Sequence, residues 1–272
     1  MKIVTLVENE AQSEKFDCAR GLSYYVETSH HKILIDAGPD DAFYRNAETL
    51  GIDLSEVDIA VLTHGHSDHA GGLPLFFQKN QKAKLYLAES ALLGYTVLGP
   101  AGEAYIGVSE EVLAKKDRFC FVEGSLQLDD EITIFPAEGS FPTMDTTDRL
   151  MVKKQGDLIP DLFQHELDVL LSEGEKQVLI CGCGHRGIIN ILKTAEAIGQ
   201  RPVDACFGGF HLFQLEETEE SHKLLCMIGK ELEKTRTVFY SAHCTGSYAV
   251  SVLEPFCSGR LMEQHSGAEI LI

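Results

Sequence analysis

The chain has 272 residues, enough for one large domain with a substantial buried core, and 44% of its residues are hydrophobic. Its 42 acidic residues outnumber 23 basic ones, which gives a formal net charge of −19. This balance argues against the basic face with which proteins bind polynucleotides, so we expect a small-molecule substrate and no nucleic-acid partner. The sequence leaves the oligomeric state open.

The first part of the chain alternates predicted strands and helices. Apolar runs bounded by turn residues predict the strands, and helical spacing of apolar residues, ended by Gly51, predicts the first helix. Strands are predicted at 3–7, 22–27, 32–35, 57–62 and 85–88, and helices at 43–50 and 72–78. The segments 90–118 and 136–166 are patterned irregularly, and we expect active-site loops there, with plain surface loops as the alternative.

After residue 166 a regular pattern returns, in which apolar strands alternate with amphipathic helices. Strands are predicted at 169–171, 178–180, 203–207, 237–242 and 268–272, and helices at 188–198 and 247–255. Another helix is predicted to start near residues 216–220. This alternation is typical of an α/β fold.

The chain shows no targeting or membrane segment. No window approaches the roughly 20 consecutive apolar residues of a membrane span, so we expect no membrane partner. The N-terminus lacks the features of a signal peptide, which favours a cytoplasmic protein. Most of the eight cysteines are scattered among apolar neighbours, where we expect reduced thiols. We interpret Cys181 and Cys183 as packing residues at a strand end, with a metal-adjacent role as the alternative.

The stretch with the clearest chemistry follows the predicted strand 57–62. His64, His66, Asp68 and His69 lie within six residues of one another. Imidazole and carboxylate are ligands for zinc, iron and manganese, and a turn at a strand end aims such ligands in different directions from one rigid base. A polar surface loop is the alternative, but three imidazoles and a carboxylate at this spacing indicate a metal site.

Three later histidines repeat this setting. His185, His211 and His243 each follow a predicted strand and precede a helix. Strand ends of this kind line up along one edge of an α/β sheet, where ligands bind, so these residues and the first cluster could hold two metal ions. The alternative for each of the three is a histidine that is buried in the core, forms hydrogen bonds within the protein and binds no metal. His165 borders the second irregular segment, and we expect it to be exposed to solvent, with a substrate-related role as the alternative.

These motifs resemble the metallo-β-lactamase superfamily. Residues 64–69 match its HxHxDH motif, and residues 33–38 match the strand that precedes it. Motifs at 182–192, 208–212 and 243–246 resemble the branch named after 7,8-dihydropterin-6-yl-methyl-4-(β-D-ribofuranosyl)aminobenzene 5′-phosphate synthase. The resemblance implies an α/β fold, the four-layer αββα sandwich. It also implies a single domain over residues 1–272, with active-site loop insertions near 90–118 and 136–166.

The resemblance implies six metal ligands and two divalent metal ions, with zinc expected and manganese or iron as alternatives. The implied ligands are His64, His66, Asp68, His69, His185 and His243. His185 stands where relatives place a bridging aspartate, and it is our candidate for the third ligand of the first metal. His211 has no standard counterpart, so we assign it to substrate binding or proton transfer, with metal ligation as the alternative.

These features predict a metal-dependent hydrolase that uses a metal-bound hydroxide on a small substrate, phosphorylated or otherwise anionic. Asp68 is the predicted catalytic residue that orients the water, and His211 stabilises charge or protonates the leaving group. Two alternatives are a dihydropterin ribofuranosyl-aminobenzene 5′-phosphate synthase-like transferase and an iron-dependent redox enzyme. The sequence identifies neither the substrate nor the metal.

Overall fold

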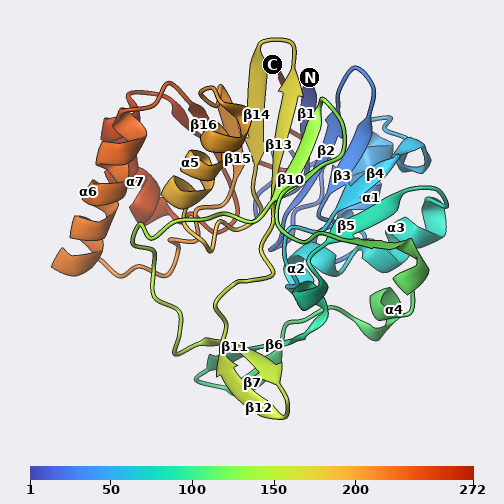
Figure 1. The fold of residues 1–272 in the computed structure, drawn as a ribbon, viewed down its shortest axis with the longest axis horizontal. Helices are drawn as coiled ribbons and strands as arrows, with labels where there is room; N and C mark the ends of the chain where they lie inside the picture. Colours follow the sequence, from blue (N-terminus) through green and yellow to red (C-terminus); the bar gives the residue numbers. More distant parts are fainter. The chain divides into compact units, whose positions relative to one another are not determined.

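The computed structural model describes residues 1–272 and divides them into two compact units. Unit 1 consists of Met1–Glu123, Asp145–Leu167 and His265–Ile272, and unit 2 consists of Gly124–Met144 and Asp168–Gln264. Each unit has its own mixed seven-stranded sheet, its own helices and its own hydrophobic core (Figure 1). The predicted α/β class is therefore confirmed.

The main sheet of unit 1 has the strand order β18-β1-β2-β3-β4-β5-β8. Its strands are β1 Lys2–Val7, β2 Ser23–Glu27, β3 Lys32–Ile35, β4 Ile59–Val61, β5 Lys84–Leu87, β8 Phe119–Phe121 and β18 Glu269–Leu271. Neighbours from β3 to β8 run parallel, so their carboxyl ends meet at one edge of the sheet. Asp36 directly follows β3, and the histidine-rich stretch follows β4, so both lie at this edge.

Helices of unit 1 pack on this sheet through large apolar side chains. The helices are α1 Ala42–Thr49, α2 Ser67–Ala70, α3 Leu73–Lys79 and α4 Glu110–Leu113, with 3-10 turns at Leu54–Glu56, Glu89–Leu92 and Lys116–Arg118. Phe43 of α1 and Phe76 of α3 are fully buried in one core with Leu34 and Leu85 of the sheet. Burying each such ring contributes on the order of 1.5–3 kcal/mol, so this core fixes the sheet edge that carries the polar residues.

Unit 1 also contains a small sheet in the two segments that we expected to be irregular. Its strand order is β12-β11-β6-β7. The strands are β6 Gly94–Gly99, β7 Gly102–Tyr105, β11 Leu150–Lys154 and β12 Asp157–Pro160. The exposed strand β7 buries no side chain, which explains why the sequence lacks the apolar alternation of a strand at this point.

The sheet of unit 2 has the order β17-β16-β15-β14-β13-β10-β9. Its strands are β9 Leu126–Gln127, β10 Ile132–Phe135, β13 Asp168–Glu173, β14 Lys176–Ile180, β15 Ala205–Gly208, β16 Val238–Ser241 and β17 Leu261–Glu263. The strands from β14 to β17 run parallel. Their carboxyl ends therefore share an edge, and the segments that contain His185, His211 and His243 leave from it.

Three helices complete unit 2: α5 Ile188–Gly199, α6 Glu219–Glu233 and α7 Ser247–Cys257. Thr218 caps α6 by accepting a hydrogen bond from the Ser221 N–H, and the acidic residues Glu219 and Glu220 lie in its first turn, where the helix dipole favours them. Helices α6 and α7 lie side by side, as Figure 1 shows.

Most predicted elements are confirmed to within a few residues, β3 with the predicted bounds. The short strands β8, β9, β10 and β17 and the small sheet of unit 1 were not predicted. No helix in the structure has both the length and the apolar composition that crossing a membrane requires.

Candidate metal centre

The metal-ligand motif of unit 1 occupies the turn between β4 and α2. His66 has an extended backbone and caps the N-terminus of α2, so His64 precedes the helix while Asp68 and His69 lie on it. One ligand atom each from His64, His66 and Asp68 lie within 4.8 Å of one another. Both imidazoles are buried, and Asp68 is half-buried. Two nitrogens and one carboxylate oxygen at this separation form a donor set that suits zinc, manganese or iron.

The third imidazole of the motif lies against the first. The ring centroids of His64 and His69 are 4.1 Å apart, and those of His64 and His66 are 4.7 Å apart. Burial lowers the pKa of His66, although the nearby carboxylates of Asp161 and Asp68 oppose this shift. A lowered pKa keeps the imidazole neutral, which is the form that binds a metal.

A buried carboxylate holds this cluster in place. Asp36 accepts hydrogen bonds from the Thr63 N–H at 2.7 Å, from the Thr63 hydroxyl at 2.6 Å and from His69 Nδ1 at 2.6 Å. Thr63 Oγ1 also lies 3.0 Å from His64 Nδ1. Since the hydroxyl hydrogen is donated to Asp36, its oxygen accepts the Nδ1 hydrogen of His64.

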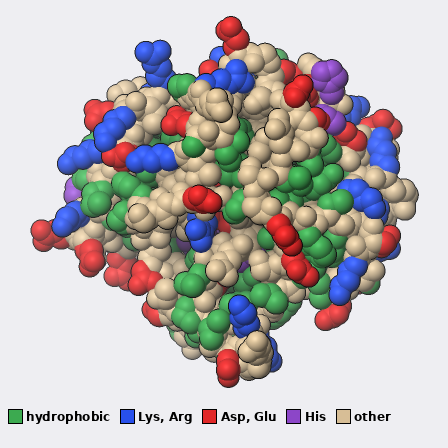
Figure 2. Space-filling view, viewed as in Figure 1, with side chains coloured by type: hydrophobic (Ala, Val, Ile, Leu, Met, Phe, Trp, Pro, Cys, Tyr) green, Lys and Arg blue, Asp and Glu red, His purple; other side chains and the backbone are tan.

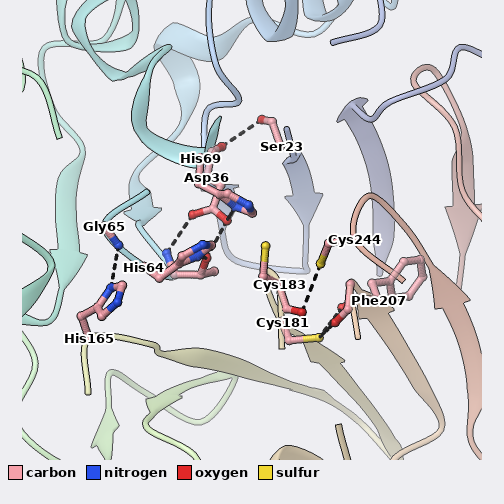
Figure 3. A network of polar contacts seen from close by, with 12 residues as sticks. Ser23, Asp36, His64, Gly65, His69, His165, Cys181, Cys183, Phe207 and Cys244 are labelled. Atoms are coloured by element: carbon pink, nitrogen blue, oxygen red, sulfur yellow. Dashed lines mark hydrogen bonds and ion pairs between the residues drawn. The ribbon is translucent and has the colours of Figure 1, made fainter. Parts of the chain in front are cut away.

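This network fixes the tautomers of two histidines (Figure 3). Both His64 and His69 carry their hydrogen on Nδ1, so each offers the lone pair of Nε2 to a metal. Asp36 itself uses its oxygens in these hydrogen bonds, and we therefore interpret it as an orienting residue. Sequence reasoning placed Asp36 in a family motif but gave it no role, although an acid at a neighbouring strand end was the available signal.

His165 is buried in unit 1, with its side chain 1% exposed, so the expectation of solvent exposure was wrong. The Gly65 N–H donates to its Nδ1 at 2.9 Å, and its Nε2 lies 2.9 Å from Asp161 Oδ2. Because a backbone N–H can only donate, Nδ1 is the acceptor and the Nε2 hydrogen is donated to Asp161. The ring also stacks on Tyr95, with centroids 4.1 Å apart. The His165 side chain therefore connects the backbone at Gly65, the carboxylate of Asp161 and the ring of Tyr95.

Asp161 connects His165 to the metal-ligand motif. Its Oδ2 lies 3.8 Å from His66 Nε2 as well as 2.9 Å from His165 Nε2. Although burial opposes the shift, contacts with His165 and His66 hold the pKa of Asp161 below its usual value. An ionised Asp161 accepts a hydrogen bond from His165 and lies beside His66. It therefore helps to place the turn that carries His64, Gly65 and His66, which we call the ligand turn.

We expect His165→Ala to lower the free energy of unfolding by about 1–3 kcal/mol, because the Gly65 N–H and the Asp161 carboxylate lose a buried partner. His165→Gln is the matched control, since its amide can accept from Gly65 and donate to Asp161. Urea unfolding measures both variants. Equal stability of His165→Ala and the wild type would contradict the assigned hydrogen bonds.

Gly65 has no room for a side chain. A Cβ at this position would overlap the Ala91 carbonyl oxygen and carbon and the Tyr95 ring. We expect Gly65→Ala to cost roughly 1–3 kcal/mol of stability, because the ligand turn must move away from this contact. Gly99→Ala is the control, since a Cβ there would meet nothing within 4 Å. Thermal unfolding of the two variants gives the comparison, and similar losses in both would show that the ligand turn tolerates the displacement.

In unit 2, His185 and His211 lie together. Their ring centroids are 3.9 Å apart, and both residues are buried. His211 and His243 have φ values of 47° and 55°, in the left-handed region that a side chain disfavours by roughly 1–2 kcal/mol per residue. Strain of this kind is often kept at functional sites. The metal and catalytic roles stay predictions for all of the candidate residues: His64, His66, Asp68, His69, His185, His211 and His243.

Two cysteines accompany His211: Cys183, which we interpreted as a packing residue with a metal-adjacent role as the alternative, and Cys244, to which no role was assigned. Ligand atoms of Cys183, His211 and Cys244 lie within 4.8 Å of one another. Burial raises the pKa of Cys244, but contacts with Cys183 and His211 and the charge of His243 lower it well below the usual value. Cys181 does fit the packing interpretation, because its thiol donates to the Phe207 carbonyl at 3.3 Å (Figure 3).

Comparisons with known proteins agree with these features. Residues 17–147 match the sequence model of the metallo-β-lactamase superfamily. The chain is 25% identical over 269 residues to 7,8-dihydropterin-6-methyl-4-(beta-D-ribofuranosyl)-aminobenzene-5'-phosphate synthase of Methanocaldococcus jannaschii, covering 90% of this chain and 88% of the relative.

Two solved structures have a similar fold. The crystal structure of Tm1679, a metal-dependent hydrolase of the β-lactamase superfamily, shares 28% sequence identity at a TM-score of 0.83, over 100% of this chain and 99% of that one. Zn²⁺-bound PqqB from Methylobacterium extorquens matches at 12% identity and a TM-score of 0.55, over 100% of both chains. At 12% identity this second similarity concerns the fold alone.

Proposed function

Because the chain carries a metallo-β-lactamase superfamily domain, we propose that it is a metal-dependent hydrolase acting on a small substrate, phosphorylated or otherwise anionic. The convergence of His64, His66 and Asp68 carries this proposal. The similarity to Tm1679, described as a metal-dependent hydrolase, extends over the whole chain and supports it.

The residues of unit 1 fit a divalent metal. His64 and His69 can present Nε2 to a metal, because their Nδ1 atoms are held by Thr63 and Asp36. The half-buried carboxylate of Asp68 lies within 4.8 Å of ligand atoms of His64 and His66. A bound metal acts as a Lewis acid and lowers the pKa of a coordinated water. We assign His64 and His66 to a first metal, and Asp68 and His69 to a second. Zinc suits such nitrogen and oxygen ligands, and manganese and iron are the alternatives.

Asp68 is the residue that we assign to the chemistry itself. Its carboxylate is half-buried, whereas His64 and His69 are enclosed, so Asp68 is the member of the motif best placed to meet water. We propose that it orients the attacking water and accepts its proton. The orienting hydrogen bonds behind the histidines hold the remaining ligands still during this step.

The charge of the chain supports a small substrate. The formal net charge is −19, and acidic and basic side chains are interspersed on the face in Figure 2. A polynucleotide substrate needs a continuous basic surface, whereas a small anion needs only the local positive field of a metal site.

A transferase is the second candidate function. The relative from Methanocaldococcus jannaschii that is 25% identical over 90% of this chain is named a synthase of a dihydropterin-methyl-ribofuranosyl-aminobenzene 5'-phosphate. The corresponding activity of this chain would be the condensation of a dihydropterin with a ribosylated aminobenzene phosphate, which requires two organic substrates. Incubating the metal-loaded protein with both substrates and finding the adduct by mass spectrometry would favour this candidate over the hydrolase.

Chelation and metal reconstitution test the proposed hydrolase. The metal-stripped protein is assayed against phosphomonoesters, phosphodiesters and lactones, then again after addition of Zn²⁺, Mn²⁺ or Fe²⁺. We expect no turnover in the stripped protein and hydrolysis of at least one substrate class after reloading. Full turnover by the metal-free protein, or no hydrolysis by any reloaded form, would contradict the proposal.

A further inference from the structure

A thiol-rich cluster in unit 2 combines three side chains from three neighbouring parallel strands. Strands β14, β15 and β16 end at Ile180, Gly208 and Ser241. Cys183, His211 and Cys244 are each the third residue beyond one of these ends. Because parallel neighbours end at the same edge, this common offset brings the three side chains together.

The separation of the three donors suits one metal ion. Their ligand atoms all lie within 4.8 Å of one another, and their residues are only 3%, 8% and 3% exposed. Around a tetrahedral zinc ion, with bonds of about 2.3 Å to sulfur and about 2.0 Å to nitrogen, neighbouring ligands lie roughly 3.5–4 Å apart. Small side-chain adjustments therefore suffice to close the cluster around an ion.

The backbone is built to hold these side chains close. A Cβ on Gly209 would overlap Cys244 Sγ, so glycine at that position makes room for the thiol. The same thiol donates to the Cys183 carbonyl at 3.3 Å (Figure 3). The Cys244 carbonyl accepts from the Leu212 N–H at 2.9 Å and from the Phe213 N–H at 3.1 Å. The turn after β16 is thus tied to the turn after β15.

Side-chain hydrogen bonds stiffen this connection further. Thr245 Oγ1 accepts from the Phe210 N–H at 3.1 Å and from the Ser241 hydroxyl at 2.7 Å, and all three groups are buried. His211, between Phe210 and Leu212, is held in the left-handed conformation with φ of 47°. Ligands whose backbone is fixed in this way lose little freedom when they bind an ion.

We propose that Cys183, His211 and Cys244 form a metal site of unit 2 that binds a zinc-type ion through two thiolates and one imidazole, with the fourth position open to an external ligand. Thiolate ligands distinguish it from the nitrogen and oxygen set of His64, His66 and Asp68. The proposal assigns His211 to metal ligation. Ligand atoms of His185 and of His243 also lie within 4.8 Å of the Cys183 sulfur, so Cys244 is the ligand that distinguishes this site from the metal roles predicted for those two histidines.

Cobalt spectroscopy tests the site, because Co²⁺ replaces zinc and shows a near-ultraviolet charge-transfer band only when thiolate is bound. The whole protein is stripped with a chelator under reducing conditions and titrated with Co²⁺ without oxygen. We expect the thiolate band in the wild type and its loss in Cys183→Ala and in Cys244→Ala, with one fewer Co²⁺ bound per chain. Cys206→Ala and Cys257→Ala remove other buried thiols of unit 2 and keep the band.

Further variants distinguish loss of the proposed site from failure to fold and from loss of turnover. Cys183→Ser and Cys244→Ser retain side-chain size and give the same loss if an alanine variant fails to fold. His66→Ala keeps the thiolate band even if it abolishes turnover, which separates this site from the proposed hydrolase. Co²⁺ that binds the wild type without a thiolate band would overturn the proposal, as would a band that survives in the folded variants of either Cys183 or Cys244.

Discussion

His66→Ala combined with Asp68→Asn is expected to reduce hydrolysis by at least about 10³-fold, equivalent to roughly 4 kcal/mol of transition-state stabilisation. The variant removes one imidazole and one carboxylate from the three donors that lie within 4.8 Å of one another. It also removes the residue that we assign to orienting the attacking water. Steady-state kinetics on the substrate found in the reconstitution assay measures the loss, with metal content determined on the same sample.

The fold is expected to survive this double substitution. His66 and Asp68 lie at the start of α2, outside the apolar core in which Phe43 and Phe76 are buried. His30→Ala is the matched control, because His30 is an exposed histidine of the same unit and leaves activity unchanged. Wild-type turnover by a folded double variant would rule out the assigned ligands.

Asp36→Ala is expected to lower the free energy of unfolding by about 3–5 kcal/mol, because it removes a buried acceptor from a buried imidazole and from Thr63. The side chains of His69 and Asp36 are 0% and 1% exposed, so water cannot replace the lost carboxylate. Metal affinity is expected to fall about 10–100-fold, since His69 loses its hydrogen bond to Asp36 and the Thr63 hydroxyl that orients His64 loses its acceptor.

Asp58→Ala provides a closely matched control. Asp58 Oδ2 lies 2.6 Å from His31 Nδ1, the same distance as in the Asp36–His69 pair, but these side chains are 36% and 21% exposed. Water can replace the carboxylate there, so we expect a loss of no more than about 1 kcal/mol and unchanged metal affinity. Denaturant unfolding and metal titration compare the two variants. Equal losses would show that burial of the Asp36 network has no special effect.

The clustering of the candidate ligands could be predicted because they are close together in the sequence. His64, His66, Asp68 and His69 follow a strand within one turn, and ligand atoms of the first three lie within 4.8 Å of one another, while their metal roles stay predictions. The strands around them were also predictable, because buried parallel strands are continuous apolar runs. The expected hydrolase chemistry rests on the same residues.

The supporting residues could not be predicted, because their partners are distant in the sequence. His165 contacts Gly65 across 100 positions, and its surroundings gave no sign of burial. Cys244 contacts Cys183 across 61 positions, and the two cysteines follow different strands. Their common offset becomes visible only when the pairing of β14, β15 and β16 is known. The small sheet of unit 1 escaped prediction because its strands are short and largely exposed.

The most direct measurement of the central claim is anomalous X-ray diffraction from crystals of the zinc-loaded protein, recorded above and below the zinc absorption edge. We expect anomalous density within bonding distance of His64 Nε2 and His66 for the first metal, and of Asp68 and His69 Nε2 for the second, with His69 Nδ1 still bonded to Asp36. Zinc-loaded crystals with no peak beside these four residues would contradict the assigned ligands.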